Sequence, residues 1–107
     1  MRSISASQLA ERLKSHNPPH LLDVREPEEH ALVALPNSTL IPLGELASRA
    51  DEIENWKDDD VVVYCHHGVR SVHAIGILGQ FGFTRLHNLS GGIDRWTEEA
   101  DPTLPRY

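Results

Sequence analysis

The sequence predicts an α/β fold with a mainly parallel sheet, because extended and helical segments alternate along it and one strand is apolar throughout. The run at 61–64, Val-Val-Val-Tyr, has the pattern of a central strand that is buried on both faces. Segments of helical periodicity separate this run from three further extended segments. Such alternation favours parallel pairing with right-handed crossovers. At 107 residues the chain fits one domain, residues 1–107, with a single hydrophobic core.

The first predicted helix has a clear N-terminal signal. Ser5 and Gln8 have the spacing of a capping box, in which each side chain bonds the backbone N–H of the other residue. Ile4 and Leu9 have the spacing of a hydrophobic staple, which fixes the direction of entry into the helix. The Asn-Pro-Pro at 17–19 ends this helix.

The later elements follow from hydrophobic period and from turn residues. Apolar residues recur at helical spacing over 43–56 and 71–83, and Gly82 is expected to cap the second of these helices. Residues 101–107 are expected to form an ordered or half-ordered tail. The other predicted elements are strands at 20–24, 58–65 and 84–89, an extended segment at 38–43, helical turns at 26–33 and a short helix at 90–100.

Composition and charge narrow the possible functions. The formal net charge of −6 disfavours a nucleic-acid partner, and no apolar run approaches the roughly 20 residues that span a membrane. The N-terminus lacks the apolar core of a signal peptide, and one cysteine excludes an internal disulfide. We therefore expect no nucleic acid, no membrane and a cytoplasmic location. The seven histidines and one cysteine show no ligand spacing, so no metal site is predicted.

The single cysteine, Cys65, ends the predicted central strand, and ligand sites in parallel sheets lie beyond the carboxyl ends of strands. The loop 66–70 has Gly68 in its middle, so its backbone N–H groups can form an anion-binding nest. The helix that begins near Ser71 adds its positive end. A cysteine there is expected to be largely thiolate, which attacks electrophilic sulfur, phosphorus or arsenic. The alternative is a small buried hydrophobe that ends a strand.

Three segments, "LLDVREPEE" (21–29), "CHHGVRS" (65–71) and "LSGGIDRW" (89–96), resemble motifs of the rhodanese-like sulfurtransferase family, in that family's order. The resemblance covers nearly the whole chain and implies a central five-stranded parallel sheet flanked by helices on both faces. It also implies that Cys65 carries sulfur as a persulfide. The donor is then a small anion such as thiosulfate or another persulfide, and the acceptor is cyanide in vitro or a thiol or protein in the cell. No cofactor is expected beyond this covalent persulfide.

The loop after Cys65 is the expected site for the persulfide, which inward-facing amides of 66–70 would stabilise. A lone cysteine fits this chemistry, because a neighbouring thiol would discharge the persulfide as a disulfide. Arg70 is expected either to bind the anionic donor or to brace the loop on a carboxylate. The two histidines either face the substrate or only shape the turn. The expected binding residues are His66, His67, Gly68, Val69, Arg70 and Ser71.

Other residues of the three segments are expected to support the site. In the resemblance Asp23 holds the loop or Arg70 by charge-assisted hydrogen bonds, and Arg25 lies at the same sheet edge. The glutamates at 26, 28 and 29 are expected to form a solvated helix start. Gly91 and Gly92 are expected to provide backbone conformation and close packing, with the following tryptophan as core or pocket wall.

Two further segments bear on the comparison with the family. The family often has "GHIPGA" where this chain has "VALPNS" (33–38), so that Asn37 replaces a turn glycine and a pocket role for this segment is in doubt. Asparagine also tolerates a left-handed conformation. The ending "EEADPTLPRY" (98–107) resembles the tail of rhodanese-like domains fused to ubiquitin-like-protein adenylyltransferases, which pass sulfur toward molybdopterin, thiamin or tRNA thiolation.

Two other functions compete with sulfur transfer. A phosphatase or arsenate reductase of related fold uses Cys-x₅-Arg to surround a tetrahedral oxyanion, whereas Cys65 and Arg70 form the shorter Cys-x₄-Arg. A non-catalytic docking or regulatory module of the rhodanese-like type usually lacks the cysteine, which is present here.

Overall fold

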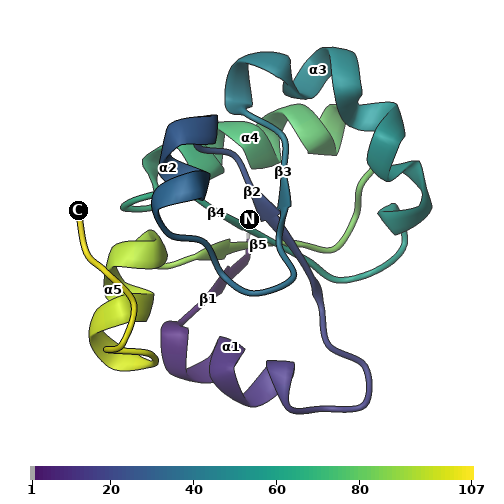
Figure 1. Cartoon of the computed structure of the whole chain (residues 1–107). Helices are drawn as coiled ribbons and strands as arrows, with labels where there is room; N and C mark the ends of the chain where they lie inside the picture. The colour runs from purple at the N-terminus through teal and green to yellow at the C-terminus, as the bar shows by residue number, and fades with distance from the viewer. Residues whose placement is uncertain (1) are drawn as a thin grey trace.

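Five short parallel strands form the middle layer of the structure, a computed structural model that describes residues 2–107 (Figure 1). The strands are β1 (Arg2–Ile4), β2 (His20–Asp23), β3 (Thr39–Leu40), β4 (Val61–Tyr64) and β5 (Leu86–Leu89). Their order across the sheet is β1-β5-β4-β2-β3, so β4 is central, as its apolar run predicted. The predicted α/β fold with a parallel sheet is therefore confirmed.

Helices cover both faces of this sheet (Figure 1). One face packs against α1 and α5, and the other packs against α3, η2 and α4. Within residues 2–107, no helix is long and apolar enough to cross a membrane. The helical elements are α1 (Ala6–Leu13), α2 (Pro27–Leu32), η1 (Leu43–Glu45), α3 (Leu46–Arg49), η2 (Ala50–Trp56), α4 (Val69–Gln80) and α5 (Gly92–Glu99).

The alternation of side chains along β4 decides which way the cysteine points. Successive side chains of a strand face opposite sides of the sheet. Val61 and Val63 lie in the core beneath α3 and α4, and Cys65 shares that core. Val62 and Tyr64 lie in the opposite core, against α1 and α5. The strand therefore places the Cys65 thiol on the side of the sheet where α4 begins.

The start of α1 follows the predicted capping box. The backbone N–H of Gln8 donates to Ser5 Oγ at 3.1 Å, and that of Ser5 donates to Gln8 Oε1 at 2.9 Å. Ile4 and Leu9, the predicted staple, are buried in the same core. Asn37 has φ 63°, the left-handed conformation expected of the residue that replaces a turn glycine.

Three elements differ from the sequence prediction in ways that bear on the sheet and the site. Strand β1 was not predicted, because three residues are too few to show a period, and its pairing with β5 is what makes it a strand. The predicted helix at 43–56 is divided into η1, α3 and η2, with non-helical angles at Ile53. Helix α4 begins at Val69 rather than near Ser71, so Arg70 belongs to its first turn.

Candidate functional site

The candidate site is the loop that joins the end of β4 to the start of α4. Cys65 directly follows β4, and only 1% of the residue is exposed. Gly68 is the N-cap of α4 and has φ 105°, a conformation that side-chain-bearing residues rarely adopt. The glycine lets the chain turn within three residues of the cysteine, so that the positive end of α4 faces the sulfur.

Two backbone amides point at the sulfur. The N–H groups of Gly68 and Ser71 lie 3.1 Å and 3.4 Å from Cys65 Sγ. The Ser71 hydroxyl lies 3.5 Å from the same atom and donates its proton to Asn88 Oδ1. Because a hydroxyl has one proton, the Ser71 oxygen can only accept a hydrogen bond from Cys65 while its own proton is on Asn88. When Cys65 is a thiolate, the Ser71 hydroxyl must turn away from Asn88 to donate to the sulfur. The loop thus provides two fixed donors and one adjustable donor for a negative sulfur.

The start of α5 holds the other side of the loop. The N–H groups of Ile93 and Asp94 donate to the carbonyl oxygens of Cys65 and His66 at 2.9 Å and 3.1 Å. A Cβ on Gly92 would lie 2.3 Å from the His66 oxygen, and Gly92 has φ 62°. Both the space and the angle therefore require glycine, as was predicted from sequence. The loop is clamped between two helix starts.

Arg70 braces the loop on a glutamate of α2. Its Nη1 and Nη2 donate to Glu29 Oε1 and Oε2 at 2.7 Å and 3.0 Å, a two-bond pairing of guanidinium with carboxylate. The hydrogen bonds from Arg70 are the main cause that lowers the pKa of Glu29 to about 2. Glu29 does lie in the predicted helix start, where it accepts a hydrogen bond from the Glu26 N–H at 3.0 Å. The expectation that it is solvated there is wrong, because Arg70 binds both of its carboxylate oxygens.

Asp23 and Arg25 form a separate, buried pair beside the loop. Both residues are 0% exposed, and Arg25 donates to the two Asp23 oxygens at 2.9 Å and 2.8 Å. Burial acts to lower the pKa of Arg25, but its hydrogen bonds to Asp23 and Tyr107 outweigh burial and raise it. Within residues 2–107, every hydrogen bond of the Asp23 carboxylate goes to Arg25, His30 or Tyr64. The expectation that Asp23 holds the loop or Arg70 directly is wrong.

The two histidines have different surroundings. The His66 ring is stacked between those of His67 and Tyr107, with ring centres 3.9 Å apart on each side. Burial, and then the neighbouring His67, lower the pKa of His66, which favours its neutral form. The His67 side chain is 65% exposed. His66 therefore packs against the C-terminal tail, and His67 is the histidine that is open to a substrate.

The structure also brings both histidines close to Asp94, which no sequence spacing indicated. One ligand atom from each of His66, His67 and Asp94 falls within 4.8 Å of the others. Arg106, however, donates to Asp94 Oδ1 at 2.9 Å and 3.1 Å, and this bond lowers the pKa of Asp94. Arg106 therefore already compensates the charge of the Asp94 carboxylate.

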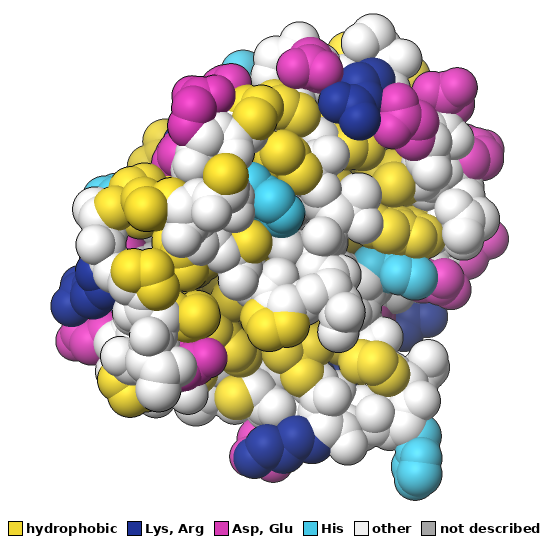
Figure 2. All heavy atoms as spheres, viewed as in Figure 1, with side chains coloured by type: hydrophobic (Ala, Val, Ile, Leu, Met, Phe, Trp, Pro, Cys, Tyr) yellow, Lys and Arg dark blue, Asp and Glu magenta, His cyan; other side chains and the backbone are white. Residues whose placement is uncertain are grey.

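Long-range electrostatics do not attract an anion to this molecule. The formal net charge is −6, and acidic side chains gather over α3 and η2 on the face shown in Figure 2. Some of that charge is paired locally, since Arg49 bonds Glu45 and Glu52. Attraction of an anionic donor to the cysteine must therefore come from the loop amides and the start of α4.

Three contributors to the site were not found from the sequence. Glu29 is 41 residues from Arg70, and Tyr107 is 78 residues from Glu29, so no local pattern links them. Asn88, which orients the Ser71 hydroxyl, lies inside β5. Asn88 lies two residues after Leu86, on the same face of the strand as this core residue, and a polar residue on a core face is the one signal that would have pointed to it.

Comparison with known sequences gives one consistent family. The rhodanese-like domain family matches residues 5–99. A sulfurtransferase of Allochromatium vinosum is 36% identical over 104 residues, which are 97% of this chain and 95% of the relative. An adenylyltransferase and sulfurtransferase of Ogataea parapolymorpha is 34% identical over 91% of this chain, which spans 25% of that longer relative.

Solved structures give the same result. A rhodanese-related protein of Thermoplasma volcanium matches with a TM-score of 0.82 and 38% identity over 94% of each chain. A rhodanese-like domain protein of Staphylococcus aureus matches with a TM-score of 0.85 and 29% identity, covering 100% of this chain and 99% of the other. The similarity therefore extends from the sheet to the tail.

Proposed function

The chain belongs to the rhodanese-like sulfurtransferase family, and on that premise we propose that it transfers a sulfane sulfur through a persulfide on Cys65. In the first half-reaction the thiolate attacks the outer sulfur of thiosulfate. The S–S bond of the donor breaks, and sulfite leaves with the electron pair. In the second half-reaction a nucleophile such as cyanide takes the outer sulfur, and the Cys65 thiolate is restored. The persulfide is the only intermediate, and no other cofactor takes part.

The observation that carries this proposal is the pair of amides at Cys65 Sγ. Gly68 and Ser71 direct their N–H groups at the sulfur from a loop that two helix starts hold rigid. Donors fixed in advance stabilise negative charge on sulfur without reorganisation during the reaction. The thiolate carries that charge on Sγ before attack, and the persulfide anion carries it on the outer sulfur bonded to Sγ.

The size of the loop and the position of Arg70 support sulfur over an oxyanion such as phosphate. Four residues separate Cys65 from Arg70, one fewer than the Cys-x₅-Arg loop discussed above. Arg70 also has both terminal nitrogens on Glu29. Phosphoryl transfer would hold a tetrahedral oxyanion in the loop, and a guanidinium free to make the same two bonds would bind it. A persulfide places one anionic sulfur atom there instead, and the loop amides can stabilise its charge while Arg70 stays on Glu29.

The acceptor in the cell is proposed to be a thiol or a protein. The names of the relatives include a sulfur carrier protein of Bacillus subtilis and adenylyltransferases with sulfurtransferase activity, which are consistent with a protein acceptor. We propose a cytoplasmic location, because a free thiol nucleophile is maintained in a reducing compartment.

Thiocyanate formation from cyanide tests the reaction. We expect turnover with thiosulfate, and with a low-molecular-weight persulfide as an alternative donor, and no turnover in Cys65→Ser. An aryl phosphate serves as the competing substrate. Hydrolysis of that phosphate with dependence on Cys65, without thiocyanate formation from either sulfur donor, would refute the proposal.

A further inference from the structure

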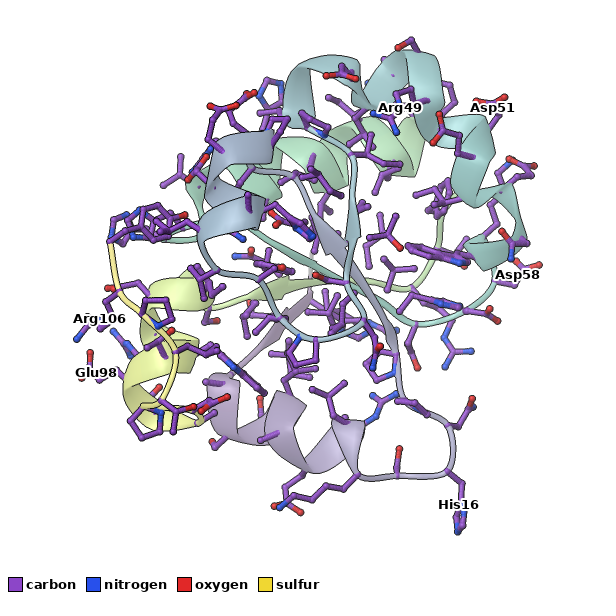
Figure 3. The ribbon with its side chains drawn as sticks, viewed as in Figure 1. His16, Arg49, Asp51, Asp58, Glu98 and Arg106 are labelled. Carbon is purple, nitrogen blue, oxygen red and sulfur yellow. The ribbon has the colours of Figure 1, made fainter. Side chains whose placement is uncertain are left out.

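The C-terminal tail runs from the end of α5 back to the cysteine loop (Figure 1). Arg106 fixes the tail to α5 through Asp94 at 2.9 Å and Glu98 at 3.6 Å, and Figure 3 shows Arg106 and Glu98 on the same side of the molecule. The next residue, Tyr107, is 40% exposed and contacts both the loop and α2. These contacts have no part in the chemistry proposed above.

The hydroxyl of Tyr107 joins two ion pairs. It accepts a hydrogen bond from Arg25 Nη1 at 2.7 Å and donates one to Glu29 Oε2 at 2.7 Å. Arg25 belongs to the buried pair with Asp23, and Glu29 belongs to the pair with Arg70. Burial, together with the bond to Glu29, raises the pKa of Tyr107 to about 12, so the phenol keeps its proton at neutral pH. One oxygen atom therefore connects the buried Asp23–Arg25 pair beside the loop to the Arg70–Glu29 pair that braces it.

The ring of Tyr107 holds the other end of the loop. It stacks on the His66 ring at 3.9 Å with an angle of 9° between the planes. His66 directly follows Cys65, while Arg70 directly precedes Ser71, which supplies one of the two amides at Sγ. Tyr107 thus acts on both sides of the segment that carries the Gly68 and Ser71 amides.

We propose that Tyr107 is a positioning residue for the persulfide site, which holds the loop between His66 and Arg70 in the conformation that directs two amides at Cys65 Sγ. Its hydroxyl sets the orientation of Glu29, and thereby of Arg70, while its ring sets the position of His66. Tyr107 does not touch the sulfur. This inference rests on the proposed function, because it concerns the same thiolate and persulfide.

Two variants separate the parts of this role. Tyr107→Phe keeps the stack on His66 but removes the bridge between Arg25 and Glu29, and Tyr107→Ala removes both. Thr103→Val is the matched control, since it removes a tail hydroxyl that bonds within the tail, to Asp101. Cys65 is the single cysteine, so the rate of alkylation by iodoacetamide at each pH reports on this site alone.

We expect Tyr107→Phe to slow alkylation at pH 7 by about three- to tenfold, which lies within the range for residues that act on a site through intervening contacts. The pH at which the alkylation rate reaches half of its maximum should rise in Tyr107→Phe. It should rise further in Tyr107→Ala and stay unchanged in Thr103→Val. The turnover number for thiocyanate should fall more than KM rises, because Tyr107 does not contact the donor. A structural role alone would lower the thermal unfolding midpoint and leave the pH profile unchanged.

The proposal is overturned if the pH profiles of both Tyr107 variants coincide with that of the wild type. Failure of the proposed function gives a different result. In that case the wild-type protein forms no thiocyanate, whatever the alkylation profiles show.

Discussion

Replacing Glu29 by glutamine removes the charge that Arg70 binds and keeps the shape of the side chain. The fall of the Glu29 pKa from its ordinary 4.5 to about 2 is equivalent to at most about 3 kcal/mol of stability. The side chains of Glu29 and Arg70 are 20% and 36% exposed, so solvent screening reduces the expected loss to about 1–2 kcal/mol. Glu28→Gln is the control, because Glu28 forms no ion pair in the part of the chain that the structure describes.

The coupling between Glu29 and Arg70 is measured by urea unfolding of the wild type, of the single variants Glu29→Gln and Arg70→Gln, and of the double variant that carries both substitutions. We expect a coupling free energy of about 1–2 kcal/mol at pH 7. Because the folded pKa of Glu29 lies below its ordinary value, this contribution is complete above about pH 5 and is lost as the pH falls from 4.5 toward 2. A coupling near zero at pH 7, or one that grows as the pH falls, would refute the assignment of Glu29 as the brace.

Two other substitutions test the clamp on the loop and its adjustable donor, and a third serves as a control. Gly92→Ala places a Cβ 2.3 Å from the His66 oxygen and should cost about 2–4 kcal/mol in urea unfolding. Gly76→Ala is the control, because Gly76 lies in α4 and nothing lies within 4 Å of the new Cβ. This substitution should raise the free energy of unfolding by about 0.5–1 kcal/mol. Equal changes in the two variants would contradict the clamp. Ser71→Ala keeps the amide and removes the adjustable donor, so alkylation of Cys65 at pH 7 should slow about two- to fivefold; an unchanged rate would show that the hydroxyl does not turn to the thiolate.

The features predicted correctly from the sequence are those set by residues close together along the chain. The capping box at Ser5 and Gln8, the apolar run of β4 and the glycines at 91 and 92 each have a local signature, and each appears in the structure. The position of Cys65 at the carboxyl end of the central strand is also local, because Cys65 directly follows the apolar run of β4.

The sequence did not predict what depends on the folded packing of distant segments. Glu29 looked like one of three glutamates at a helix start, and its role is created by Arg70 from a different helix. Tyr107 reaches the loop only because the tail turns back along α5, and the motif match assigned Asp23 the bracing role that Glu29 has. Residues that contact each other only in the folded chain are too far apart in the sequence to form a recognisable motif.

The intact mass of the protein after treatment with thiosulfate tests the central claim most directly. Persulfide formation predicts a gain of one sulfur atom, located on the peptide that contains Cys65. Cyanide should then remove that atom and restore the original mass, and Cys65→Ser should gain nothing. A wild-type protein that gains no sulfur, or a Cys65→Ser variant that gains the same mass, would contradict the account.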